Sequence, residues 1–384
     1  MINFDNNATT PVDESVLEEL IRATRDFSGN TSSGHSLGNA AGKYLLACRQ
    51  RVAKVLNAAD ADEIVFTSGG TESDNAAVRG IGWAMKGKGR TGLVTSAIEH
   101  RAVLNPCEWL KGHGFGLTVL PVDGNGVVDL AAAKAAINIK TALVSVMTAN
   151  NEIGTIQPIR ELAELAHAAG AVLHSDAVQA VGKMPVDVQA LGVDSISLSA
   201  HKFYGPKGVG VLYLKKGTPY DCFMLGGTHE GGRRAGTVPL PQIAALTVAL
   251  ELAESKRIKQ GEWLRGLRDQ LVRELLAKVP GAHVNGDLKQ TTLNTASIRF
   301  DGIYGGHLLR EMDKHGILAS AGSACMWEIT RPSHVLTALG LSDEEGGGTI
   351  RFSLGYANTP EEVTRVADTL AKLVPQLRAQ PAAL

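Results

Sequence analysis

Residues 141–180 contain the stretch that decides the fold, "TALVSVMTANNEIGTIQPIRELAELAHAAGAVLHSDAVQA". An apolar run near each end of this stretch has the length and composition of a buried strand, and each run ends in polar residues. Between the two runs, Pro158 suits the first turn of a helix and Gly170 suits its end, with one apolar face between them. Strand, helix and strand in this order predict a right-handed crossover and a parallel sheet that is covered on both faces.

The same alternation continues on both sides of this unit. Residues 63–85, "EIVFTSGGTESDNAAVRGIGWAM", predict a strand, a Gly-Gly turn and a helix, and "GLVTSAIEH", "FGLTVLPVD" and "DSISLSAHK" each predict a buried strand followed by polar residues. Farther along, a long helical stretch at about 241–278 precedes the strands "TASIRF" and "TIRFSLG". We therefore expect an α/β fold with a large domain of mostly parallel sheet at residues 12–258. Residues 1–11 and 259–384 are expected to form a smaller α+β domain.

Composition argues against several classes of protein. The 384-residue chain carries 38 basic and 39 acidic residues, so it lacks the positive charge typical of nucleic-acid binding. No apolar run is long enough to cross a membrane, and the N-terminus has no basic segment followed by an apolar stretch, so we expect neither a membrane span nor a secretory signal. Four scattered cysteines, without a CxxC pair or an HExxH motif, argue against a metal site and indicate reduced thiols in a cytoplasmic protein.

Polar residues follow the carboxyl ends of five expected strands. In an open parallel sheet these ends meet at one edge, where ligands bind. The residues concerned are Ser68–Thr71, Glu99–His100, Asn150–Asn151, Asp176–Gln179 and Ser199–Lys202. The sequence therefore predicts one crevice that these side chains share.

Lys202, in "SLSAHKFYGPKGVGVLYL", directly follows a buried strand. Poor hydration there favours its neutral amine, the form that condenses with an aldehyde. Asp176, at the end of another strand, can hold the protonated pyridine nitrogen of pyridoxal 5′-phosphate (PLP), and Gln179 can donate to the phenolic oxygen of that cofactor. Taken alone, Lys202 also fits a surface loop, and Asp176 also fits a helix cap.

Residues 67–75, "TSGGTESDN", and His100 complete this group. Gly69 and Gly70 let the backbone approach a phosphate, Thr71 adds a hydroxyl group, and the following helix offers its positive end. His100 can stack on the face of the pyridine ring. Gly-rich turns before helices are frequent, however, and a lone histidine at a strand end is often structural, so neither motif decides the function by itself.

Cys325 lies in "LASAGSACMWEITRP", residues 318–332, among small residues without a periodic apolar pattern. This context favours a presented thiol, whose thiolate is the reactive form, over a packing residue. A small buried hydrophobe is the alternative, and it is what we expect of Cys48. We expect residues 326–332 to form a partly docked loop, because Trp327 needs a surface to cover.

The ordered motifs "TSGGTESDN", "EH", "NNEIG", "DAVQ", "SAHKFYGPKG", "RRAGT", "GSAC" and "IRFSLG" closely resemble those of the NifS/IscS-like cysteine desulfurases, PLP enzymes of the class V aminotransferase family. The likeness begins at "NNATTP" and covers nearly the whole chain. It implies the architecture of PLP-dependent transferases of fold type I. It also implies a cytoplasmic homodimer that takes sulfur from L-cysteine, releases L-alanine and passes the sulfur to an acceptor protein, in iron–sulfur cluster assembly or another sulfur pathway.

The resemblance also implies roles for the matching residues. Lys202, Cys325 and His100 would be catalytic, with Lys202 bonded to PLP and acting as the base, and Cys325 as the nucleophile that carries a persulfide. Asn151 and Arg351 would hold the substrate carboxylate. The remaining residues would hold the cofactor: Asp176 at its pyridine nitrogen, Gln179 at its phenolic oxygen, His100 on its ring face, Gly70, Thr71, Ser199 and His201 at its phosphate, and Thr237 at the phosphate in the partner subunit.

Other activities stay open at this point. Selenocysteine is chemically close to cysteine, so a selenocysteine lyase fits the same residues. Another PLP-dependent transaminase or lyase would not need Cys325, and a non-catalytic sulfur-transfer platform would not need Lys202 and Asp176. A nicotinamide dehydrogenase is poorly supported, because no GxGxxG motif follows the first strand with an acidic residue about twenty positions on.

Overall fold

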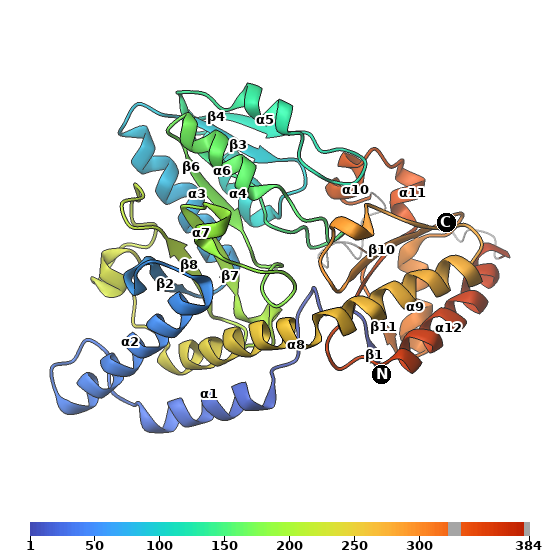
Figure 1. Cartoon of the computed structure of the whole chain (residues 1–384), viewed down its shortest axis with the longest axis horizontal. Coiled ribbons are helices and arrows are strands. Elements are labelled where there is room, and N and C mark those ends of the chain that lie inside the picture. Colours follow the sequence, from blue (N-terminus) through green and yellow to red (C-terminus); the bar gives the residue numbers. More distant parts are fainter. Residues whose placement is uncertain (322–331, 380–384) are drawn as a thin grey trace.

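A computed structural model describes residues 1–321 and 332–379 of the chain. Its main sheet has seven strands, and all neighbours from β7 to β4 are parallel, whereas β8 is antiparallel to both β7 and β2 (Figure 1). The strands in their order across the sheet are β2 (Ile64–Thr67), β8 (Gly210–Leu214), β7 (Ser195–Ser199), β6 (Val172–Asp176), β5 (Thr141–Ser145), β3 (Gly92–Ser96) and β4 (Gly116–Leu120). The predicted α/β class with a mostly parallel sheet is confirmed.

Helices cover both faces of this sheet. The helices that pack on it are α2 (Ser36–Leu56), α3 (Gly70–Lys86), α4 (Arg101–Lys111), α5 (Leu130–Ala136), α6 (Ile159–Ala168) and α7 (Val188–Leu191). Successive side chains of a strand point to opposite faces. Leu143 of β5 accordingly belongs to the apolar cluster of α3 and α4, and Val144 belongs to the cluster of α2 and α6. The long apolar runs in the sequence follow from this burial on two sides.

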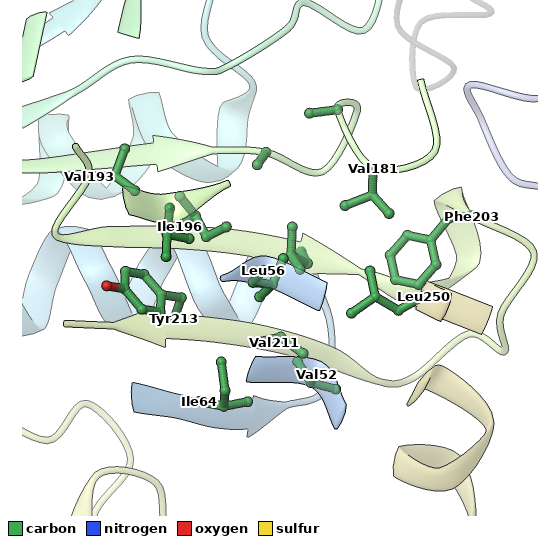
Figure 2. Close-up of a cluster of buried hydrophobic side chains, with 14 of the residues drawn as sticks. Val52, Leu56, Ile64, Val181, Val193, Ile196, Phe203, Val211, Tyr213 and Leu250 are labelled. Carbon is green, nitrogen blue, oxygen red and sulfur yellow. The ribbon is translucent and has the colours of Figure 1, made fainter. Parts of the chain in front are cut away.

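The core beneath β7 and β8 holds the end of β7 in place. Figure 2 shows this cluster of buried side chains, which includes Val52 and Leu56 of α2, Val211 of β8, Phe203 and Leu250. Each of these residues is at most 1 % exposed. Phe203 therefore anchors the turn that directly follows β7.

Helix α8 (Leu240–Lys278) connects the two parts of the molecule (Figure 1). Its 39 residues span about 58 Å. Leu246 in its first half packs into the core of the main sheet, and Leu267 in its second half packs into a separate apolar cluster. Helix α1 (Glu14–Asp26) lies along the first half.

The second apolar cluster belongs to a small antiparallel sheet and its helices. The sheet has the order β12 (Thr349–Ser353), β10 (Thr295–Phe300) and β9 (Ala282–Val284). The helices of this region are α9 (Gly305–Lys314), α10 (His334–Ala338), α11 (Asp343–Gly347) and α12 (Pro360–Ala379). Two separate cores support the expected division at residues 11/12 and 258/259, which stays a proposal.

The N-terminal segment passes from one core to the other. Strand β1 (Ile2–Asn3) pairs in parallel with β11 (Ile317–Leu318), and Phe4 is fully buried in the second cluster. A few residues later, the N–H of Thr10 donates to the carbonyl oxygen of His201 at 2.9 Å. Residues 4–10 therefore lie between the small sheet and the carboxyl edge of the main sheet.

Two sequence expectations have different outcomes. Cys48 is fully buried, as predicted for a packing residue. The prediction that β4 is buried is wrong, because β4 lies at the edge of the sheet and Val119 is 46 % exposed. Within the described ranges, no helix is both long and apolar enough to cross a membrane.

Candidate active site

The carboxyl ends of the strands place the predicted polar residues at one edge of the main sheet. Lys202 ends a 3₁₀ turn, Ala200–Lys202, that directly follows β7, and Asp176 is the last residue of the neighbouring strand β6. Asn150 links two further strand ends, because its Nδ2 donates to the carbonyl oxygen of Ile98 at 2.9 Å. The carboxyl ends of these strands therefore lie at one edge of the sheet, and the crevice that the predicted side chains would share stays a prediction.

The amine of Lys202 lies among backbone carbonyl groups of the N-terminal segment. Its Nζ donates to the carbonyl oxygens of Asn7 and Ala8, both at 2.8 Å. Burial, and to a lesser degree the charge of Arg351, lowers the pKa of Lys202 to about 8, although the charge of Asp176 opposes both effects. A substantial fraction of this amine is therefore neutral and nucleophilic at mildly alkaline pH.

Asp176 presents a buried carboxyl group at the same edge. Its Oδ1 accepts from the N–H of Val178 at 2.9 Å, and no side chain of the described residues donates to this group. Burial raises the pKa of Asp176, and the charges of His100 and Lys202 oppose that rise. A buried carboxylate needs a closely bound cation. The protonated nitrogen of a bound pyridine ring would supply one.

Behind Asp176, two further titratable groups form a buried polar layer. Burial lowers the pKa of His174 to about 3, and its ring nitrogens lie 2.9 Å from Oγ of Ser145 and 3.0 Å from Oγ of Ser197. Burial and the charge of Asp176 raise the pKa of Asp74 well above its ordinary value, which favours the protonated form. Both groups of this layer therefore favour their uncharged forms beside Asp176.

A cradle for an oxyanion lies where β2 passes into α3. Gly69 has a φ of 150°, and a Cβ atom on Gly70 would lie only 2.7 Å from Cγ2 of Val178. The backbone N–H groups of residues 70–72 have no acceptor within the described part of the chain. Ser199 faces this turn, since a Cβ atom on Gly69 would lie 3.7 Å from its Oγ. Free backbone donors at the positive end of a 17-residue helix suit a phosphate group.

Two histidines lie at this edge. Burial lowers the pKa of His201 to about 4, so its ring is neutral near pH 7, and its Nδ1 lies 3.1 Å from Oγ1 of Thr9. His100 is exposed and caps the start of α4, where its Nδ1 accepts from the N–H of Ala102 at 3.1 Å. His201 can thus donate to an oxyanion, and His100 leaves its ring accessible to a ligand.

Gln179 forms its hydrogen bonds within the chain. Its Nε2 donates to the carbonyl oxygen of Asn7 at 2.9 Å, and its Oε1 accepts from Nζ of Lys183. The amide nitrogen therefore lies beside the carbonyl oxygen that also accepts from Lys202. One of its two N–H groups is left for a ligand.

Arg351 of β12 brings a buried cation from the small sheet to the same place. Its Nη2 lies 2.7 Å from Oδ1 of Asp5, and its Nη1 donates to the carbonyl oxygen of Asn151 at 3.1 Å. The Nε of Arg351 is buried and has no hydrogen-bond partner in the described ranges. A buried donor without a partner costs free energy, so this N–H is suited to a ligand with an acceptor oxygen.

Thr237 lies apart from the other predicted residues. It is exposed, and it has no hydrogen bond to them within the described part of one chain. Its segment is anchored by a buried ion pair, in which Nη1 and Nη2 of Arg49 bond both carboxylate oxygens of Glu230 at 2.8 and 2.7 Å. Arg234 also bonds Glu72 in the first turn of α3 at 2.8 Å. These contacts hold the segment near the cradle.

Asn7 is the residue that sequence reasoning missed. Its carbonyl oxygen accepts from Lys202 and Gln179, its Oδ1 accepts from Lys183 at 2.9 Å, and its Nδ2 donates to the carbonyl oxygen of Asn151 at 3.1 Å. The motif "NNATTP" contains it, but a motif at one end of a chain does not show which distant groups it will meet. Cys325 and most of its predicted loop lie outside the described residues.

No group of three or more His, Cys, Asp or Glu side chains that could hold a metal ion occurs in the ranges that the structure describes. The donors at the edge are instead an amine, a carboxyl group, a guanidinium group and free backbone N–H groups. Such a set fits an organic cofactor with an aldehyde, a basic ring nitrogen and a phosphate. PLP is a cofactor of this kind.

Comparisons with known proteins agree with this chemistry. The profile of the class-V aminotransferase family matches residues 2–366. A curated relative from Methanosarcina thermophila, named cysteine desulfurase IscS, is 45 % identical over 98 % of this chain and 93 % of its own length. A solved NifS-like protein has a TM-score of 0.91 at 37 % identity, covering 98 % of this chain and 100 % of its own. Another structure, SspA in complex with cysteine, has a TM-score of 0.80 at 34 % identity, covering 92 % and 99 %.

The Arg49–Glu230 pair provides a test of how the Thr237 segment is held. Their side chains are 9 % and 1 % exposed, so the substitution Arg49→Met leaves an unpaired buried carboxylate. We expect it to lower the free energy of unfolding by about 3–5 kcal/mol, measured by urea denaturation. The matched control is Arg51→Met, which breaks a pair with Glu251 whose side chains are 37 % and 39 % exposed. The control should cost about 1 kcal/mol or less; equal small losses in both variants would contradict the anchoring role.

Proposed function

We propose that Cys325 takes the sulfur of L-cysteine and that L-alanine is released, because the chain belongs to the class-V aminotransferase family and is a PLP-dependent cysteine desulfurase. The observation that carries the proposal is the buried amine of Lys202 beside the buried carboxyl group of Asp176. Neither group has a compensating ion pair of its own among the described side chains. Both are therefore suited to a cofactor that bonds the amine and brings a cation to the carboxylate.

PLP would be held by residues of this edge. When bound, it supplies an electron sink that stabilises negative charge on the α-carbon of an amino acid. Lys202 would bond to it covalently, and Asp176 would hold its pyridine nitrogen. Gln179 would donate to its phenolic oxygen, and His100 would lie on its ring. The phosphate would be held by Gly70, Thr71, Ser199 and His201.

The substrate carboxylate would bind to Arg351 and Asn151. The unpaired Nε of Arg351 supports this role, because a carboxylate oxygen would satisfy a buried donor. Asp5 and the carbonyl oxygen of Asn151 hold the other two nitrogens of the guanidinium group, so its orientation is fixed before substrate arrives. The amide side chain of Asn151 has no hydrogen bond within the described chain and is left for the substrate.

Lys202 would move the proton. Its Nζ, with a pKa of about 8, is a suitable base for the α-proton of the substrate near neutral pH. The carbonyl oxygens of Asn7 and Ala8 would hold the resulting ammonium group through hydrogen bonds. The same group can return its proton to the product, so one lysine serves both steps.

Cys325 would carry the sulfur. Its thiolate attacks the sulfur of the substrate, a new S–S bond forms, and the Cβ–S bond of the substrate breaks. The electron pair of the broken bond stays with the three-carbon fragment, which gains protons and leaves as L-alanine. The product on the protein is a persulfide, whose outer sulfur is then available to an acceptor thiolate.

The proposed enzyme is a cytoplasmic homodimer that delivers sulfur to an acceptor protein. The exposed position of Thr237, on a segment anchored near the cradle, supports a role toward the cofactor of the partner subunit. Three described cysteines are free thiols, which suits a reducing compartment. Iron–sulfur cluster assembly is one pathway that such an acceptor would serve.

The substitution Cys325→Ala tests the assignment of the nucleophile. In the presence of a thiol reductant that frees the persulfide sulfur as sulfide, we expect the variant to keep the absorbance of bound PLP but to lose the release of alanine and sulfide from L-cysteine, because the sulfur then has no acceptor. Cys48→Ala is the control, and it should keep the activity of the wild type. Alanine release at the wild-type rate by Cys325→Ala would contradict the proposal. Release of alanine by the wild type from selenocysteine but not from L-cysteine would contradict it as well.

The substitution Arg351→Gln tests the carboxylate site. We expect it to weaken the binding of L-cysteine by about 10²-fold, the cost of losing a buried charge partner. Binding of cysteamine, which lacks the carboxylate, should change little. The measurement is a titration of the absorbance of bound PLP with each ligand, and equal losses for both ligands would show that Arg351 does not hold the carboxylate.

A further inference from the structure

Lys183 is a buried lysine that the proposed reaction leaves without a role. It lies in the turn between β6 and α7 and is 7 % exposed. Its Nζ donates to Oδ1 of Asn7 at 2.9 Å and to Oε1 of Gln179. Among the described residues, no carboxylate oxygen lies within ion-pair distance of this amine. Burying an amine without an acid is costly, which points to a purpose beyond stability.

Lys183 and the carbonyl oxygen of Asn7 both favour one orientation of the Gln179 carboxamide. An amide can turn by 180° with little change in shape, and its neighbours decide which end is nitrogen. Lys183 is a donor, so it selects the oxygen of Gln179. The NH₂ group must then point the other way, where it donates to the carbonyl oxygen of Asn7 that also accepts from Lys202.

We propose that Lys183 is a positioning residue, whose Nζ holds Gln179 with its NH₂ group, and not its oxygen, turned toward Lys202 and the cofactor that Lys202 binds. The inference rests on the proposed function, since it concerns the donor that Gln179 offers to the phenolic oxygen of PLP. If the carboxamide turned over, its oxygen would face that phenolic oxygen, and two acceptors would oppose each other.

The charged groups around Lys183 fit a role that depends on hydrogen bonding. Burial, and the charges of Lys202 and Arg351, lower the pKa of Lys183 well below its ordinary value. Burial lowers the pKa of His201 as well, and the charges of Lys202, Lys207 and Lys183 add to that effect. A neutral amine still has two N–H groups, one for each of its two acceptor oxygens. Lys183 can therefore hold Gln179 with or without its proton.

The test is the pH titration of the absorbance of PLP in the loaded enzyme. A donor on the phenolic oxygen makes that oxygen less basic, so the proton shared with the bonded lysine nitrogen is lost at lower pH. We expect Lys183→Met to raise the midpoint of the absorbance change by about half a pH unit or more. Lys216→Met, at a side chain that is 82 % exposed, is the control and should leave the midpoint unchanged.

A second substitution separates positioning from a direct effect of charge. Gln179→Leu removes the donor itself and should raise the midpoint in the same way. Adding Lys183→Met to Gln179→Leu should then produce no further shift, because Lys183 acts through Gln179. A further shift in the double variant would overturn the proposal, and so would an unchanged midpoint in Lys183→Met.

Folding is checked by thermal melting of each protein without PLP. If Lys183→Met does not fold, Lys183→Arg keeps a donor at this position and should keep the midpoint of the wild type, and a raised midpoint would overturn the proposal. The proposed function fails by a separate result: wild type that binds PLP but releases no alanine. That result leaves the absorbance test of Lys183 intact.

Discussion

The burial of the Lys202 amine determines which groups the surrounding residues must provide. Nζ of Lys202 is surrounded by the carbonyl oxygens of Asn7 and Ala8 and lies near the cation of Arg351. Burial lowers the pKa of this amine to about 8, so its neutral form is populated near that pH. The two carbonyl groups allow the amine to be protonated without an acid partner. A base that alternates between these states needs both properties.

This arrangement depends on residues that are far apart in the sequence. The N-terminal segment is held by the small sheet at Phe4 and by the main sheet at Thr10, and Asn7 lies between them. Arg351 reaches the same place from β12. The site is therefore complete only when both cores have folded and α8 has brought them together.

Local patterns predicted the parts of the site that one strand and its following turn provide. Asp176 ends a buried strand and Lys202 ends the turn that directly follows another, so their position at one edge follows from the parallel order. The contacts of Asn7 and Lys183 are not predictable in this way, because each depends on side chains from distant segments. The exposure of β4 could not be predicted from the sequence either, because an apolar strand has the same pattern at the edge of a sheet as at its centre.

The proposed chemistry depends on the pKa of Lys202, which burial lowers to about 8. This pKa can be measured from the rate at which the cofactor-free protein captures PLP between neutral and strongly alkaline pH. The bond is then reduced with borohydride, and the modified peptide is identified by mass spectrometry. We expect modification of Lys202 to reach half of its maximal rate near pH 8. A rate that continues to rise up to the ordinary lysine pKa of 10.5 would contradict it.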